Sequence, residues 1–353
     1  MLAYNPLTTG PSARLFPLLA ALVALLACNY AQAADHRVVV YYQTTHYNGS
    51  ATTPVSLLPL IADGDVAATH VLIGAVHIVD EADGWIRLND FNPDNAIFDH
   101  VWSDAAALQA AGVTVMAMVG GAAAGSWSRL EQDFETYYAP LHDFVGAYNL
   151  QGLDLDVEQA MSLDGVVRLI DRLKADFGDG FVVTLAPVAA ALTEGGGNLS
   201  GFSYFDLEAQ RGSSIAFYNG QFYYGWGDAS SAADYEDILD DGFPADKVVM
   251  GQLTSPDNGN GYVSLDAVQP VLRELAAKNP TFGGVAGWEY FNSLPGGAAN
   301  PQQWAAWMRD AIASGTQVVA REISKTEKVR RAVRRDYRLF RREAKRFYRN
   351  YVA

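Results

Sequence analysis

The sequence predicts an α/β fold, a closed (β/α)8 TIM barrel, from three observations. Eight short segments with strand character follow one another along the chain, and most of them are continuously apolar, as strands covered on both faces must be. The gaps between them, about 25–40 residues, suit a crossover helix. A doubly wound open sheet is the competing fold, but no Gly-x-Gly-x-x-Gly follows the first strand and the number of units is eight. The predicted strands are Arg37–Tyr42, His70–Val76, Val113–Val119, Gln151–Glu158, Phe181–Ala186, Ser214–Tyr218, Lys247–Gly251 and Gly283–Trp288.

Helical patterns fill the gaps between the predicted strands. Phe98–Gln109 and Pro301–Met308 carry apolar residues at helical spacing, which assigns them to an outer ring that packs on the barrel. The predicted helices are Ala105–Ala111, Tyr137–Tyr148, Leu163–Asp176, Ala233–Leu239, Asp266–Ala277 and Pro301–Ile312.

The composition predicts one globular domain over residues 35–317. The chain has 353 residues, of which 50% are hydrophobic, and no second compositional regime interrupts this range. The formal net charge of −15 is uneven, because residues 321–353 contain 13 Lys and Arg but only four Asp and Glu. Such an acidic body repels polyanions, so a nucleic-acid partner is not expected.

The first 33 residues have the pattern of a secretory signal peptide. Arg14 precedes an apolar run over residues 15–27 that is short for a membrane span, and Ala31-Gln32-Ala33 offers small residues for cleavage. We therefore expect a secreted, extracellular protein; an uncleaved anchor or a lipid attached to Cys28 are the alternatives. Cleavage after Ala33 leaves no cysteine, so disulfides are not expected to stabilise the mature chain.

Residues 318–353 are predicted to form a basic amphipathic helical tail. Three partners remain open for it: an anionic membrane or cell-wall surface, the acidic barrel itself, or no partner at all. The apolar stripe of the helix consists of Val333, Tyr337, Phe340, Ala344, Phe347 and Tyr351.

The segment 151–158 combines a buried strand with three acidic residues. Asp154, Asp156 and Glu158 alternate with aliphatic residues, so their carboxyl groups point to one face of the strand. Carboxyl groups crowded in this way resist joint ionisation, and one of them is expected to keep the proton that a general acid needs. An edge strand with a solvated acidic face is the alternative. In a barrel, Glu158 falls at the carboxyl end of its strand, where active sites lie.

The acidic strand carries a family resemblance. Residues 152–158, Gly-Leu-Asp-Leu-Asp-Val-Glu, resemble the Asp-Gly-x-Asp-x-Asp-x-Glu motif of glycoside hydrolase family 18, which contains chitinases and endo-β-N-acetylglucosaminidases. The resemblance spans residues 37–290 and is greatest to the compact hevamine-like branch of plants and fungi, because about 30 residues between the last two strands leave no room for an extra α+β domain. Further matches are Gly120-Gly121, Ala186-Pro187, Phe217-Tyr218-Asn219 and Gly287-Trp288.

The resemblance implies a role for each residue of the predicted catalytic set. Glu158 protonates the glycosidic oxygen, and the substrate's own acetamide supplies the nucleophile. Asp156 then holds the acetamide N–H, Asp154 stores negative charge behind it, and Tyr218 donates its hydroxyl to the acetamide oxygen.

Three aromatic or polar residues are predicted to contact substrate. Trp288, at the end of the eighth strand, offers a flat apolar surface for a sugar ring, with ordinary barrel packing as the alternative. Tyr41 is a weaker candidate for the pocket wall, and Asn219 follows from the sixth-strand match. Glu289 is expected to serve in structural pairing. Five further aromatic residues in loops, each more commonly packing than stacking, are Trp127, Tyr223, Tyr224, Trp226 and Tyr262.

Three positions depart from the family pattern. Gln151 replaces the first Asp of the motif, Met118 stands where a Ser is usual, and Ala216 replaces a Gln often found two residues before the sixth-strand Tyr. Gln151 starts its strand and is not expected to reach the reacting bond, whereas Ala216 is expected to widen the pocket floor.

The sequence therefore predicts a secreted, monomeric chitinase that cleaves β-1,4-linked N-acetylglucosamine polymers with retention. Cleavage of N-glycan cores and a silent chitin-binding lectin are the alternatives, although such lectins usually lose the acid that Glu158 provides. No metal or other cofactor is expected, because the six histidines show no metal-ligand spacing.

Overall fold

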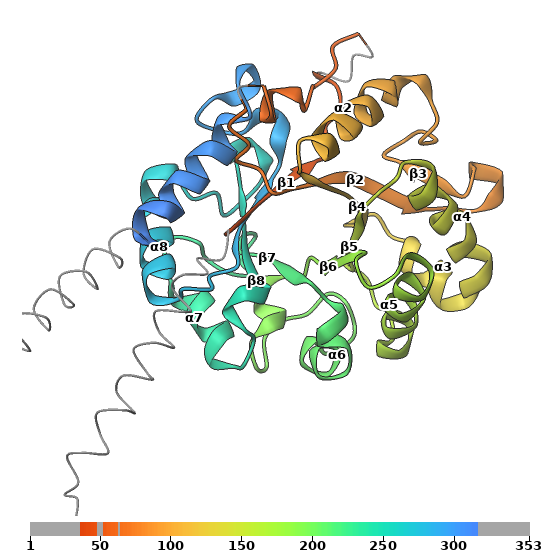
Figure 1. Cartoon of the computed structure of the whole chain (residues 1–353). Helices are drawn as coiled ribbons and strands as arrows, with labels where there is room; N and C mark the ends of the chain where they lie inside the picture. The colour runs from red at the N-terminus through yellow and green to blue at the C-terminus, as the bar shows by residue number, and fades with distance from the viewer. Residues whose placement is uncertain (1–35, 48–51, 63, 317–353) are drawn as a thin grey trace, which may run out of the picture. The chain divides into compact units, whose positions relative to one another are not determined.

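The computed structural model describes residues 36–47, 52–62 and 64–316, and it contains a ring of eight parallel strands (Figure 1). The order is β1-β9-β8-β7-β6-β5-β4-β2, and pairing of β1 with β2 closes the ring, while β3 (Ile86–Leu88) adds an antiparallel hairpin to β2. The predicted signal peptide and tail lie outside the described residues. The ring strands are β1 (Arg37–Tyr42), β2 (His70–Ile78), β4 (Thr114–Gly120), β5 (Gly152–Asp156), β6 (Val182–Leu185), β7 (Phe217–Gln221), β8 (Val248–Leu253) and β9 (Gly284–Trp288).

Helices cover the outside of the ring, which completes the predicted TIM barrel (Figure 1). Two of them, α3 and α6, have no counterpart among the predicted helices, and the last predicted helix is found at 303–316. No described helix is long and apolar enough to cross a membrane. The helices are α2 (Asp99–Ala110), α3 (Ser126–Gln132), α4 (Phe134–Ala147), α5 (Leu163–Phe177), α6 (Tyr204–Arg211), α7 (Ala233–Asp240) and α8 (Leu265–Lys278).

Strand β7 begins three residues later than the sequence predicts. After α6, Gly212–Ser214 form a 3-10 turn, and the strand runs from Phe217 to Gln221. The apolar pattern around residue 216 has no alternation that marks where the strand starts. The shift moves the carboxyl end of β7 from Tyr218 to Gln221, and this changes which side chains reach the mouth of the barrel.

The core has two layers because successive side chains of each strand point to opposite faces. Leu153 and Leu155 of β5 belong to the large layer between the strands and the helices. The smaller layer fills the inside of the barrel and consists of Val39, Tyr41, Leu72, Ala75, Met116, Met118, Phe217, Val249 and Ala286. The interior is therefore packed, and only the mouth is free to hold a ligand.

The mouth lacks the insertion that distinguishes larger relatives. Between β8 and β9 the described chain contains only the short 3-10 helix η8 (Pro256–Asn258) and α8. The expectation of a compact barrel without an extra α+β domain is confirmed.

Candidate active site

The acidic strand β5 presents its carboxyl groups to the inside of the barrel. Asp154 is fully buried and Asp156 is 5% exposed, whereas Glu158 lies two residues beyond the strand and is partly exposed. The alternation with Leu153 and Leu155 is therefore the one predicted from the sequence, and the alternative of a solvated edge strand is wrong, because β4 and β6 flank β5 on both sides.

Asp154 is held by three neutral donors. The Tyr41 hydroxyl donates to Oδ2 at 2.8 Å, and Oδ1 accepts from the Thr184 hydroxyl at 2.6 Å and from the Asn219 amide at 3.1 Å. Burial raises the pKa of Asp154, and these three hydrogen bonds oppose the rise because they stabilise the charged form. Of the two buried aspartates, Asp154 thus has more hydrogen-bond donors.

Asp156 and Glu158 share a single amide group. Nε2 of Gln221, at the end of β7, lies 3.3 Å from Oδ1 of Asp156 and 3.1 Å from Oε1 of Glu158, and it also donates to the Ala186 carbonyl at 3.0 Å. Burial raises the pKa of Asp156 well above its ordinary value, and the nearby charges of Glu158 and Asp154 raise it further. The unequal environments of Asp154 and Asp156 favour charge on the first and a proton on the second.

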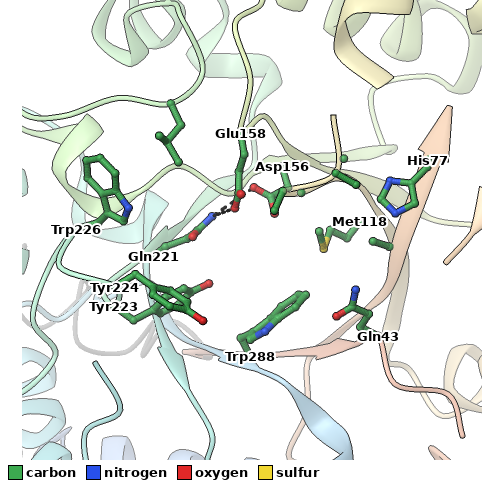
Figure 2. A pocket seen from close by; sticks show the side chains of 16 residues that line it. Gln43, His77, Met118, Asp156, Glu158, Gln221, Tyr223, Tyr224, Trp226 and Trp288 are labelled. Atoms are coloured by element: carbon green, nitrogen blue, oxygen red, sulfur yellow. Dashed lines mark hydrogen bonds between the residues drawn. The ribbon is translucent and has the colours of Figure 1, made fainter. Parts of the chain in front are cut away.

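These carboxyl groups lie at one side of a pocket of about 630 Å³ in the barrel mouth. Figure 2 shows Glu158, Asp156 and Gln221 beside the pocket, with Trp288 below them and His77 and Gln43 on the wall across from Gln221. The residues that line the pocket are Gln43, Ala75, His77, Met118, Gly120, Gly121, Ala122, Ala123, Asp156, Glu158, Leu199, Gln221, Tyr223, Tyr224, Trp226 and Trp288.

The prediction for Tyr218 is wrong. Its side chain is fully buried on the outer side of the barrel wall, and its hydroxyl donates to Oε2 of Glu208 on α6 at 2.8 Å. Tyr223 lines the pocket instead, and burial together with the charges of Asp156 and Glu158 raises its pKa well above the ordinary value, which keeps the hydroxyl protonated.

The sequence contained the signal for Tyr223. Gln221-Phe222-Tyr223 has a Gln two residues before a Tyr, which is the spacing that the family resemblance expects at the sixth strand. The earlier pair Phe217-Tyr218 lacks that Gln, so Ala216 is not a replacement for it. Ala216 does not line the pocket either, because it packs at the start of β7 against the interior layer.

Two other predicted substrate contacts lie one layer beneath the pocket. Tyr41 is 7% exposed and Asn219 is 2% exposed, and neither is among the residues that line the pocket. Both donate to Asp154, so they support a carboxylate and do not face a ligand. Direct substrate contact by Tyr41 and Asn219 stays a prediction, which their place beneath the pocket does not favour.

Trp288 lies where the sequence places it, at the end of β9 and partly exposed in the pocket. Its ring centroid is 5.5 Å from that of Tyr41, with the ring planes tilted by 58°. Glu289, the next residue, accepts hydrogen bonds from the backbone amides of Gln43 and Thr44 at 3.0 and 2.8 Å. It fixes the turn after β1, in keeping with the structural role expected for it.

Some of the remaining departures from the family pattern and of the loop aromatic residues line the pocket, and the others lie outside it. Met118 lines the pocket. Gln151 is exposed at the start of β5, and its Oε1 accepts a hydrogen bond from the Val115 amide at 2.8 Å. Trp127 is fully buried and donates to the Asp156 carbonyl at 3.0 Å. Tyr224 and Trp226 join Tyr223 in the pocket, and Tyr262 does not. Within the described residues, no group of three His, Cys, Asp or Glu side chains is placed to hold a metal ion.

A (β/α)8 barrel with crowded carboxyl groups beside an aromatic platform is typical of the class of barrel glycosidases. No family model matches the sequence. A fungal endo-β-N-acetylglucosaminidase of glycosyl hydrolase family 18 is 46% identical in structure-based comparison, over 78% of this chain and 97% of its own, with a TM-score of 0.74. The chitinase ChiC of Aspergillus fumigatus is 49% identical over 78% and 99% of the two chains, with a TM-score of 0.71.

Sequence comparison finds chitinases at lower identity. Chitinase 2 of Rhizopus oligosporus is 25% identical over 314 residues, which cover 81% of this chain. The chain spans 55% of the length of that relative. The chain belongs to glycoside hydrolase family 18.

Proposed function

We propose that the protein is a chitinase that hydrolyses β-1,4-linked N-acetylglucosamine polymers with retention, from within the chain. The observation that carries the proposal is the placing of Asp156 and Glu158 on one amide of Gln221, at the side of a pocket that Trp288 lines. The similarity to ChiC supports chitin as the substrate class.

Glu158 is the proposed general acid because it is the carboxyl group nearest the open pocket. Its protonated form donates to the glycosidic oxygen, and its carboxylate form later takes a proton from water. The pair is supplied with a proton because Asp156, whose pKa is raised by burial and by its acidic neighbours, stays protonated at rest.

The acetamide of the substrate is the proposed nucleophile, so the protein must orient that group. Asp156 accepts its N–H and Tyr223 donates to its oxygen, which takes over the role first assigned to Tyr218. Asp154, with its three donors, holds the compensating negative charge behind Asp156. These fixed groups favour the positively charged oxazolinium-like intermediate.

Replacement of Glu158 tests the proposal. Wild-type protein should cleave an N-acetylglucosamine tetramer and release products in the β configuration, and Glu158→Gln should lose at least about a thousandfold in kcat. Asp143→Asn, at an exposed site on α4, is the matched control and should keep full activity. Binding without turnover by both wild type and Glu158→Gln would support the lectin alternative.

Cleavage of the chitobiose core of N-glycans is a second candidate, favoured by the similarity to the fungal endo-β-N-acetylglucosaminidase. Both reactions use a substrate acetamide, so the catalytic groups do not separate them. A glycoprotein and chitin oligomers assayed side by side at equal enzyme concentration would distinguish the two, because kcat/KM then ranks the substrates directly.

The proposed chitinase acts outside the cell, as a monomer, and its basic tail is proposed to contact an anionic membrane or cell-wall surface. The net positive charge of residues 321–353 supports this contact. Removal of these residues should reduce attachment to the surface and leave activity in solution unchanged. Unchanged attachment would eliminate the surface role.

A further inference from the structure

One wall of the pocket carries two polar side chains that make no hydrogen bond within the described part of the chain. They belong to Gln43 and His77, which lie across the pocket from Gln221 and Tyr223 (Figure 2). The backbone of Gln43 is fixed on both sides, because its amide donates to Glu289 at 3.0 Å and its carbonyl accepts from Asn89 at 3.0 Å. Its side-chain amide is left to face the pocket.

His77 is placed level with Asp156 by the register of the sheet. Val76 pairs with Val119 and Gly120 pairs with Asp156, so His77 lies two strands away from Asp156 at the same height in the barrel. Two strand spacings correspond to about 10 Å between the backbones. That distance leaves room for a sugar ring between the two side chains.

The ring nitrogens of His77 differ in their surroundings. Nδ1 is sealed from solvent and has no hydrogen-bond partner among the described residues. A hydrogen on Nδ1 would therefore be a buried donor without an acceptor, which disfavours both the Nδ1–H tautomer and the imidazolium. Burial also lowers the pKa of His77, with Asp90 opposing the effect. Both effects favour a neutral ring that carries its hydrogen on Nε2.

We infer that His77 is a specificity-determining residue, whose Nε2–H donates to an acceptor oxygen of a bound N-acetylglucosamine unit on the wall opposite Gln221. The acceptor is a sugar hydroxyl or an acetamide carbonyl, and the neighbouring Gln43 amide is placed to bind the same unit. The inference rests on the proposed function, because it takes its ligand from that reaction. It adds a polar recognition element to a site whose opposite wall is aromatic.

The experiment measures binding without turnover. In a Glu158→Gln background, calorimetry would compare the affinity for the N-acetylglucosamine tetramer with and without a second change at position 77. Gln places an amide nitrogen near the position of Nε2, Asn places one near Nδ1, and Phe keeps the ring but removes both nitrogens. His142→Phe, at a partly exposed histidine on α4 outside the pocket, is the matched control.

Loss of the donor should weaken binding about tenfold in His77→Phe and His77→Asn, while His77→Gln stays within about threefold of the parent. If the Phe variant does not fold, the comparison of Gln with Asn carries the test. Equal affinity in all variants overturns the inference and leaves the proposed function standing. Absence of tetramer binding and of wild-type turnover overturns the proposed function, and the inference with it.

Discussion

The two ends of the barrel place their charged groups in opposite ways. At the mouth, Asp154, Asp156 and Glu158 meet only neutral donors, and no Lys or Arg is among the residues that line the pocket. The floor is the opposite end of the barrel, where the strands begin. There the Arg37 guanidinium lies 4.5 Å from the centroid of the Phe217 ring and donates to the carbonyl oxygens of Asp246 and Gly283.

The difference shows how one architecture serves stability and chemistry separately. A cation beside Asp156 would lower its pKa and remove the proton that the reaction needs. The carboxyl groups at the mouth have no Lys or Arg among the residues that line the pocket. At the floor, Arg37 contacts an aromatic ring and backbone carbonyl groups. Four predictions test this separation.

The largest effect is expected from Asp156→Asn. Activity should fall about a thousandfold, because the amide of the variant can neither supply a proton to Glu158 nor carry negative charge beside the acetamide. The free energy of unfolding of Asp156→Asn should exceed that of wild type at neutral pH. The pKa of Asp156 is raised in the folded protein, so its stabilising contribution is present below the unfolded pKa and is lost as pH rises.

Urea unfolding of wild type and Asp156→Asn at pH 5 and pH 8 measures that contribution. The advantage of the variant should grow with pH, and Asp143→Asn should show no such trend. A variant that is less stable than wild type at pH 8 would contradict the assignment of a protonated Asp156.

Gln221→Leu comes next, with an expected loss of about a hundredfold in kcat. Removal of the N–H donor makes the Asp156 carboxyl group harder to ionise, so the pH profile of kcat/KM should move to higher pH. Gln252→Leu is the matched control, because Gln252 is a buried glutamine on the neighbouring strand β8 whose amide meets only the sulfur of Met308. An unshifted pH profile in Gln221→Leu would exclude the positioning role.

At the floor, His70 should make the protein less stable in acid without affecting catalysis at neutral pH. Burial, aided by Arg37, lowers the pKa of His70 to about 4 in the folded protein. Its contribution to stability is complete above the unfolded pKa of about 6.5 and is lost as pH falls towards 4. The loss between pH 7.5 and pH 4.5 should be about 2 kcal/mol.

His70→Phe should remove that part of the pH dependence, as measured by denaturant unfolding at the two pH values. His142→Phe, at a partly exposed site, should leave that pH dependence unchanged. Equal pH dependence in wild type and His70→Phe would show that another group causes the acid loss.

The smallest effects separate two tyrosines on the two sides of the barrel wall. Tyr223→Phe should lower kcat about tenfold and leave unfolding unchanged, because only a donor in the open pocket is lost. Tyr218→Phe should lower the free energy of unfolding by about 1 kcal/mol and leave kcat unchanged, since its hydroxyl serves Glu208. The reverse pattern would restore Tyr218 as the residue that acts on the substrate.

The predicted site residues differ in whether a local sequence pattern or a contact between distant residues determines their position. The alternation at Asp154, Asp156 and Glu158 was readable because a strand forces side chains to opposite faces over a few residues. The assignment of Tyr218 failed because Phe217-Tyr218 and Phe222-Tyr223 are near-identical pairs five residues apart, and only the start of β7 decides which Tyr reaches the mouth. The Gln at position 221 marked the correct pair.

The residues that were missed depend on partners far along the chain. Gln221 gains its role from Asp156 and Glu158, more than 60 residues away, and the tautomer of His77 follows from what surrounds Nδ1. No local sequence pattern predicts the role of Gln221 or the tautomer of His77. Tyr41 was a candidate for the pocket wall and Asn219 followed from the family resemblance, but the depth of both, and hence their hydrogen bonds to Asp154, depends on how the ring of strands closes.

The sequence by itself determined eight strands, most of the covering helices and an acidic strand, since hydrophobic periodicity is local and depends on neighbouring residues. Tertiary structure alone decided which carboxyl groups share a hydrogen-bond donor, which polar groups support a buried carboxyl group and which remain without a partner in the pocket. Those properties depend on burial and on contacts between distant strands, because desolvation and hydrogen bonding shift a pKa only once the barrel has closed around the group.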